Sequence, residues 1–311
     1  MNSQIEAWRV QAYTANVYNL SQQKGSRLAG VVRNEMFKGK SEFFDRLGLA
    51  TAQKKTARNG STPNLDIDHT RRMVTTSMYE WATLVDRKDK LQNIHSPENQ
   101  YSLAAANALG RSLDDVIIAA ALGTAATGED GSSTSSMGNT NKVAAVSAGT
   151  IARMNVQALL KAKLLLDQAE AVGPRYFIHT AAMLEAMLEQ TQVTSADFNT
   201  VKALVNGEVD TFLGFKFIHS ERLPLASVYS TGWKYATDTG LYSASGSSLG
   251  STEYSGICFV GDGLVLGKNE GAVGRIDERP DASYSMQVYA SMDFGAVRME
   301  ENKVVEIIAL P

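Results

Sequence analysis

The chain has 311 residues, of which 44% are apolar and 20% are charged, and its formal net charge is −3. These values allow a sizeable core and exclude a collagen-like chain, a generally disordered chain and a polycation. The one cysteine, Cys258, excludes an internal disulfide framework and a cysteine-based zinc cluster. The sequence has no run of 18 apolar residues and no secretory signal pattern, so we expect a soluble globular protein made inside a cell.

Positive charge is concentrated at the start of the chain. Residues 1–60 hold ten lysines and arginines against four acids, a balance of +6, so the remaining 251 residues carry −9. This asymmetry predicts a basic arm that meets an acidic surface, either nucleic acid or a neighbouring copy of the chain. A solvated polar arm explains the pattern equally well, because the charges are dispersed and no aromatic stacking platform accompanies them. Residues 1–40 read as a weakly helical polar extension without a core of its own.

The segment from 41 to 95 reads as a long polar hairpin. Apolar residues alternate with Asp66 and Asp68, which is the period-2 pattern of a strand, and Asn59-Gly60 supplies turn chemistry between two extended stretches. A two-stranded hairpin with no covering face is marginal in water. It therefore needs support, and another copy of the protein is the natural source.

The clearest helix is predicted over residues 96–123. Ser96 provides an N-cap, Pro97 occupies the first helical position, and Gly123 stands where a C-cap glycine belongs. About 25 residues at ~1.5 Å each make a rod of roughly 37 Å. The Gly/Ser/Thr-rich stretch 124–149 is predicted to be a structureless loop, either an active-site lid or an inter-subunit contact.

Helices and strands alternate through the next part of the chain. Helices are predicted over 151–171 and after the capping residues Thr180 and Ser195, and strands at 175–179 and 212–219.

The final third of the chain is β-rich. Residues 257–260 and 264–266 flank Gly261-Asp262-Gly263, which is a hairpin signal. Strand character continues through 286–299, and the apolar run 304–310 predicts a buried C-terminal strand.

Few residues point to catalysis. The four histidines share no metal-ligand spacing, although His179 and His219 each end an apolar strand and could converge on a metal. Histidines at such positions more often form hydrogen bonds at the strand end. No phosphate-binding loop and no nucleophile elbow is present, and Cys258 lies in an apolar strand as a buried hydrophobe does. We therefore predict no catalytic, cofactor or metal site.

The order of these segments resembles the HK97-like major capsid proteins of tailed bacteriophages. The resemblance covers nearly the whole chain and implies an α+β fold with an N-terminal arm, an extended β-hairpin loop, a long spine helix, and peripheral and axial domains. Carried over, the segments are the arm (1–40), the extended loop and its return into the peripheral domain (41–95), the spine helix and flexible loop (96–150), the axial domain (151–250) and the peripheral-domain sheet return (251–311).

The resemblance also implies the function. The chain would assemble, as pentamers and hexamers in the host bacterial cytoplasm, into the icosahedral virion shell around a double-stranded DNA genome, without enzyme activity, cofactor or membrane. Scaffolding, portal and decoration proteins would be further partners, and contact with DNA would be independent of sequence. Inter-subunit contacts are expected at Lys54, Lys55, Arg58, Arg71 and Arg72, and a basic arm on the inner surface at Arg9, Lys24, Arg27 and Arg33.

Three other functions remain open from the sequence. One is an encapsulin-like nanocompartment shell on the same fold. A second is a soluble metal-dependent hydrolase that uses His179 and His219. The third is a nucleic-acid-binding module built on the basic arm, which the overall acidity of the chain disfavours.

Overall fold

A computed structural model gives the structure of residues 22–56, 58, 62, 64–85, 98–190, 211–230 and 232–311. The chain divides into two compact units. Of the described residues, the smaller unit contains 22–26, 78–85, 98–113 and 270–293, and the larger unit contains all the others. No helix in the described ranges is long and apolar enough to span a membrane.

The main elements are, in chain order, β1 (Arg33–Met36), β2 (Ser41–Leu47), β3 (His69–Thr75), β4 (Ser77–Val85), α2 (Glu98–Leu122), β5 (Ala125–Thr127), β6 (Ser133–Ser135), β7 (Lys142–Ala144), β8 (Val146–Ser147), β9 (Thr150–Ile151), α3 (Val156–Gln168), β10 (Arg175–His179), α4 (Ala181–Leu188), β11 (Thr211–Phe212), β12 (Phe215–His219), α7 (Ala226–Tyr229), β13 (Lys234–Tyr235), β14 (Ser247–Ser248), β15 (Tyr254–Val260), β16 (Leu264–Arg279), β17 (Ser285–Arg298) and β18 (Val304–Ala309).

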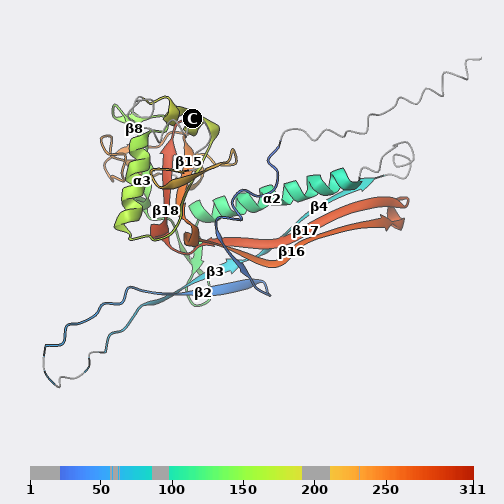
Figure 1. Cartoon of the computed structure of the whole chain (residues 1–311), viewed down its shortest axis with the longest axis horizontal. Coiled ribbons are helices and arrows are strands. Elements are labelled where there is room, and N and C mark those ends of the chain that lie inside the picture. The colour runs from blue at the N-terminus through green and yellow to red at the C-terminus, as the bar shows by residue number, and fades with distance from the viewer. Residues whose placement is uncertain are drawn as a thin grey trace, which may run out of the picture. The chain divides into compact units, whose positions relative to one another are not determined.

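A six-stranded mixed sheet, ordered β11-β12-β10-β15-β18-β7, forms the centre of the larger unit. Its strands β15 and β18 pair antiparallel, and all but one of their residues are buried. Helix α3 packs against this sheet (Figure 1), and Leu159 and Leu166 of the helix join Phe177 and Ile307 of the strands in one apolar cluster. The mainly apolar composition of β15 and β18 is what a strand covered on both faces requires.

A second sheet of the larger unit, ordered β2-β3-β5-β6, holds the root of the hairpin. β2 and β3 pair antiparallel from Ser41↔Thr75 to Leu47↔His69, and β3 pairs on its other side with β5. Beyond this pairing, the limbs 48–56 and 64–68 have no strand partner among the described residues. Figure 1 shows both limbs continuing past β2 and β3 with no other element of the larger unit beside them.

The smaller unit contains β4, the outer parts of β16 and β17, and α2 as far as Leu113. These strands belong to the sheet ordered β1-β16-β17-β4. A short 3₁₀ turn, Pro280–Ala282, joins β16 to β17, and Ser283 and Tyr284 follow with left-handed φ values of 54° and 58°. The Tyr289 hydroxyl donates to Glu80 Oε2 at 3.2 Å and links β17 to β4.

Most predicted helices and strands are confirmed. The long helix is α2, the helix expected within 151–171 is α3, and the strand expected at 175–179 is β10. Thr180 caps α4 by accepting a hydrogen bond from Met183 N–H at 3.3 Å. The helix expected after Ser195, and the turn and cap residues Asn59, Gly60, Ser96 and Pro97, lie outside the described residues.

The prediction of a structureless loop over 124–149 is wrong. This stretch contains β5, β6, β7 and β8, and all three residues of β7 are buried as the edge strand of the six-stranded sheet. The short strands were hidden by their Gly, Ser and Thr content, because their stability comes from partners distant in the sequence.

The hairpin predicted at Gly261–Gly263 is also wrong. These residues form a 3₁₀ turn between β15 and β16, and the two strands belong to different sheets. The last segment of the chain therefore contributes to two sheets: β15 and β18 lie in the six-stranded sheet with β10, and β16 and β17 lie in the four-stranded sheet with β1 and β4.

The strand predicted from the alternation around Asp66 and Asp68 begins only at His69. Leu65 and Ile67 precede β3 and belong to no strand.

We expect Ile307→Ala to lower the free energy of unfolding by about 2–5 kcal/mol, because Ile307 is fully buried in the main apolar cluster and its truncation leaves a cavity. Urea unfolding of the unassembled chain measures this change. The control is Leu49→Ala, an exposed site whose change is expected to stay within about 0.5 kcal/mol. Equal losses for the two variants would contradict the assigned core.

Candidate assembly surfaces

The limbs of the hairpin expose large apolar side chains. Leu49 is 94% exposed and Leu47 is 70% exposed, and Leu65 and Ile67 on the opposite limb are also exposed. Four such residues on one narrow hairpin form an apolar surface that water does not favour. This surface is therefore suited to contact with another molecule.

Basic side chains lie on the first limb of the same hairpin. Lys54, Lys55 and Arg58, three of the residues expected at inter-subunit contacts, are all exposed. Asp66 and Asp68 lie on the second limb. The two limbs thus carry opposite charge, and the basic limb favours an acidic partner surface.

The root of the hairpin is held by an ion pair between a buried arginine and a half-buried glutamate. Arg72, on β3, is only 2% exposed, and its guanidinium binds the Glu301 carboxylate. Arg46 on β2 approaches the same carboxylate at 3.6 Å, and the Ser135 hydroxyl donates to Glu301 Oε1 at 2.8 Å. The structure places Arg72 inside the fold of its own chain, which corrects the expectation that it lies at a surface between subunits.

The electrostatics of this root follow from burial and charge. Burial alone would raise the pKa of Glu301, but hydrogen bonds, including that from Ser135, and the charges of Arg72 and Arg298 hold it below its ordinary value. Burial lowers the pKa of Arg72. Glu301 is therefore ionised at neutral pH, and its negative charge balances the positive charge of the buried Arg72 guanidinium.

Arg298 closes the C-terminal end of α2. Its Nη1 donates to the carbonyl oxygens of Ala121 at 2.7 Å and Gly123 at 2.8 Å, and its Nη2 donates to Ser135 O at 3.2 Å. The last carbonyls of a helix lack intrahelical donors and carry partial negative charge, so a cation there is favourable. One fully buried side chain thus joins α2, β6 and the end of β17.

Arg71 points to the surface, unlike its neighbour Arg72. Its Nε lies 2.6 Å from Asp45 Oδ1 on the paired strand β2, and both side chains are exposed. Exposed pairs of this kind contribute little to stability. Arg71 therefore remains accessible, and its predicted inter-subunit contact stays a prediction.

The residues expected in the basic arm have different environments. The amides of Arg27 and Leu28 donate to the two carboxylate oxygens of buried Asp114, at 3.0 and 3.1 Å, which anchors the chain at this point. Lys24 is exposed, and exposed Arg33 pairs with Glu35 at 2.7 Å. Arg9 lies outside the described residues. The inner-surface location of the arm stays a prediction.

His179 and His219 do converge. They are paired residues on parallel strands β10 and β12, and their ring centroids are 5.9 Å apart. His219 Nε2 lies 2.7 Å from Glu221 Oε1, and its Nδ1 lies 2.8 Å from Arg27 Nη1. Because a guanidinium only donates, Nδ1 of His219 accepts the hydrogen bond from Arg27, and Nε2 donates to Glu221.

Among the described residues, the histidine pair has no third metal ligand. Within the described ranges, no group of three or more His, Cys, Asp or Glu side chains is placed to hold a metal ion. Asp114 and Asp115, which follow each other on α2, do not act as a pair either, because Asp115 binds Arg222 while Asp114 accepts backbone hydrogen bonds. Asp114 and Asp115 therefore hold parts of the fold together through separate partners.

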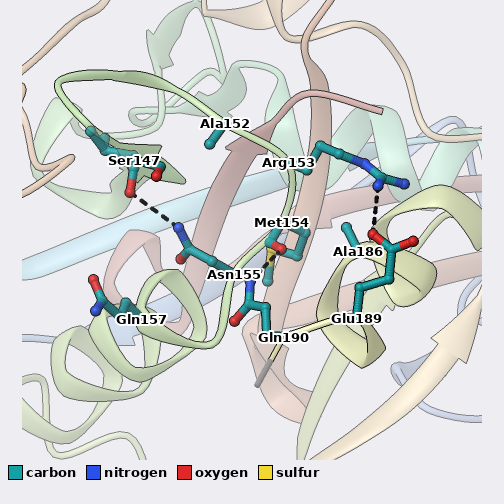
Figure 2. Close-up of a pocket in the computed structure, with 10 residues that line it drawn as sticks. Ser147, Ala152, Arg153, Met154, Asn155, Gln157, Ala186, Glu189 and Gln190 are labelled. Carbon is teal, nitrogen blue, oxygen red and sulfur yellow. Dashed lines mark hydrogen bonds and ion pairs between the residues drawn. The ribbon is translucent and has the colours of Figure 1, made fainter. Parts of the chain in front are cut away.

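A pocket of about 630 Å³ lies between the β8–α3 connection and α4 (Figure 2). Four of its polar side chains are engaged with one another or with backbone. Arg153 pairs with Glu189 at 2.8 Å, Gln190 bonds Met154 O and Val156 N–H at 3.0 Å each, and Asn155 caps α3. The lining contains no histidine or cysteine. It offers no nucleophile with an adjacent base.

The sequence patterns did not identify the residues that hold the hairpin root. Arg298 lies at the end of the predicted strand 286–299 and Glu301 follows it, neither gives a motif, and their partners are more than 150 residues earlier in the chain. A charged residue at the end of an apolar strand was the one available signal.

Comparisons with known proteins agree on one fold. The family model described as "Phage capsid protein" matches residues 5–310. A search of curated proteins finds no match.

Three solved structures are similar over almost their whole length. The capsid of the cyanophage P-SCSP1u has a TM-score of 0.73 at 17% identity, over 99% of this chain and 95% of that one. The head structure of the Helicobacter pylori bacteriophage KHP40 has a TM-score of 0.67 at 11% identity, over 94% of each chain. The structure titled Mycobacterium phage Che8 has a TM-score of 0.64 at 16% identity, over 96% and 97%.

We expect Arg298→Met to lower the free energy of unfolding by about 3 kcal/mol, because it leaves buried carbonyls of α2 and β6 without a donor. Urea unfolding of the unassembled chain measures this loss. The matched control is Arg33→Met, which removes an exposed ion pair and is expected to cost less than about 1 kcal/mol. Similar values for both would show that the helix end does not depend on Arg298.

We expect the chain to lose stability as the pH falls from about 7.5 to 5.5. Burial, with the nearby charge of His219, lowers the pKa of His179 below its ordinary value of about 6.5. The unfolded chain therefore binds this proton more readily, so acidification favours unfolding in this window. Urea unfolding at several pH values should show a slope that His179→Gln reduces. An unchanged slope in that variant would exclude His179 as its source.

Proposed function

The chain belongs to the phage capsid protein family, and from this premise we propose how it builds its shell: copies associate as pentamers and hexamers, and each hairpin is supported by a neighbouring copy. The protein is a major capsid protein that forms the phage shell. Its place is the virion capsid.

The observation that carries this proposal is the uncovered hairpin. Its root is held within the chain by β5 and by the Arg72–Glu301 pair, but the limbs 48–56 and 64–68 expose leucine and isoleucine to water. An extended two-stranded ribbon with such a surface is marginal alone. A neighbouring subunit provides the missing face.

Assembly then depends on many modest contacts. Each hairpin buries a small apolar area with a few basic side chains, of which Lys54, Lys55, Arg58 and Arg71 are the candidates. Closed symmetric assembly repeats the same contact around the shell, so that weak individual contacts give a stable particle.

Other partners are proposed from the family. The shell encloses double-stranded DNA, and exposed basic residues such as Lys24 and Arg33 contact it without reading sequence, or pair with acidic patches of adjacent subunits. Scaffolding, portal and decoration proteins join the same assembly, which takes place in the bacterial cytoplasm.

No observation favours the other functions. The family match and the similar structures are of phage capsids, which are structural proteins. The histidine pair has no third ligand in the described part of the chain, so nothing supports the metal-dependent hydrolase. Nothing supports a nanocompartment either.

We expect the chain to fold but form no shells when residues 49–67 are replaced by Asn-Gly. Gly48 N–H already donates to Asp68 O at 2.7 Å, so a two-residue turn closes the shortened hairpin without strain on its root. Negative-stain electron microscopy tests assembly, and circular dichroism with urea unfolding tests the fold. Normal shells from this variant would contradict the proposed role of the hairpin.

A further inference from the structure

The outer part of β16 has a free edge. On one side β16 lies beside β17, and on the other side β1 pairs only with residues 265–268. Residues 270–279 therefore have no strand on that side among the described residues. Their outward N–H and C=O groups form a template for another strand.

This part of the strand is also exposed on its two faces. Every residue from 270 to 278 is exposed apart from half-buried Val273, whereas Ser285, Val288 and Ser291 of β17 are buried. Ile276, at 42% exposure, is a large apolar side chain in the middle of the free edge. The outer part of β16 is therefore not buried by other elements in the way that these residues of β17 are.

Natural edge strands are often protected by lysines, by other charged side chains or by prolines. The stretch 270–279 contains no lysine and no proline, and its charges are of both signs: Glu270, Arg275, Asp277, Glu278 and Arg279. A mixture of charges can complement a second strand in one register and oppose it in others.

We infer that this edge pairs antiparallel with the same edge of a second copy, about a two-fold axis at Ile276. In that register Arg275 of each copy faces Asp277 of the other, Glu278 faces Gly274, and the two Ile276 side chains face each other. Two ion pairs thus surround an apolar contact, and no like charges stand opposite. The inference rests on the proposed shell, whose closed symmetry supplies two-fold-related copies.

Neighbouring registers are unfavourable. A two-fold axis at Arg275, Asp277 or Glu278 sets two identical charges opposite each other, and an axis at Gly274 sets Glu270 opposite Glu278. An axis at Val273 would bring the second strand against residue 267, where β1 already pairs. The charge pattern and the position of β1 exclude these registers, so the register with its axis at Ile276 remains.

A cysteine on the axis tests this contact directly. Opposite Cα atoms in an antiparallel pair lie about 4.5–5.5 Å apart, within the range of about 4.4–6.8 Å that a disulfide spans. The native Cys258 is fully buried, so it does not compete. We expect Ile276→Cys shells, mildly oxidised, to give mostly disulfide-linked dimers on a non-reducing gel.

The matched control is Met78→Cys on β4, at the other end of the same sheet order and 64% exposed, which is expected to stay monomeric. Adding Arg275→Asp to Ile276→Cys should lower crosslinking several-fold, because two aspartates then face each other. Adding Asp277→Arg as well should restore it, since the ion pair is rebuilt with reversed sign.

Shells of Ile276→Cys that stay monomeric would overturn the inference, and so would equal crosslinking at Met78→Cys or no effect of the charge changes. Failure of the unaltered chain to form shells would contradict the proposed function instead. In that case crosslinking of unassembled Ile276→Cys at high concentration still tests the edge contact, and its absence there would also count against it.

Discussion

The larger unit depends on the hydrogen bonds that the buried guanidinium of Arg298 donates. It satisfies carbonyls at the end of α2 and one carbonyl of β6 from the end of β17, so three elements meet at one cation. Three residues later, Glu301 binds Arg72 of β3. A strand end, a helix end and the hairpin root are thus fixed together, because the buried guanidinium groups of Arg298 and Arg72 need partners from the protein where water does not reach them.

This fixed root contrasts with the limbs that leave it. Up to Leu47 and His69 the hairpin is part of a four-stranded sheet, and beyond them its limbs belong to no strand in the described structure and their leucines are exposed. The root fixes the direction in which the limbs leave the sheet, and the exposed apolar and basic surface of the limbs is suited to contact with a second molecule. For a member of the phage capsid family, we propose that this molecule is another copy in the shell.

Local signals made α2, α3 and α4 predictable, because caps and helical periodicity act within a few residues, as Thr180 does for Met183. The resemblance to HK97-like capsid proteins is confirmed by the family match over residues 5–310. Sheet membership was not predictable, since β15 and β16 are three residues apart but pair in different sheets. The root was missed for the same reason: Arg72 and Glu301 are 229 positions apart.

Backbone hydrogen exchange of residues 48–68 tests the central claim most directly, measured by mass spectrometry on unassembled chains and on purified shells. In the unassembled chain these amides should exchange at nearly the rate of an unfolded peptide, while β15 and β18 stay protected. In shells the same limbs should become protected. Limbs already protected in the unassembled chain, or equally unprotected in shells, would contradict support by a neighbouring copy.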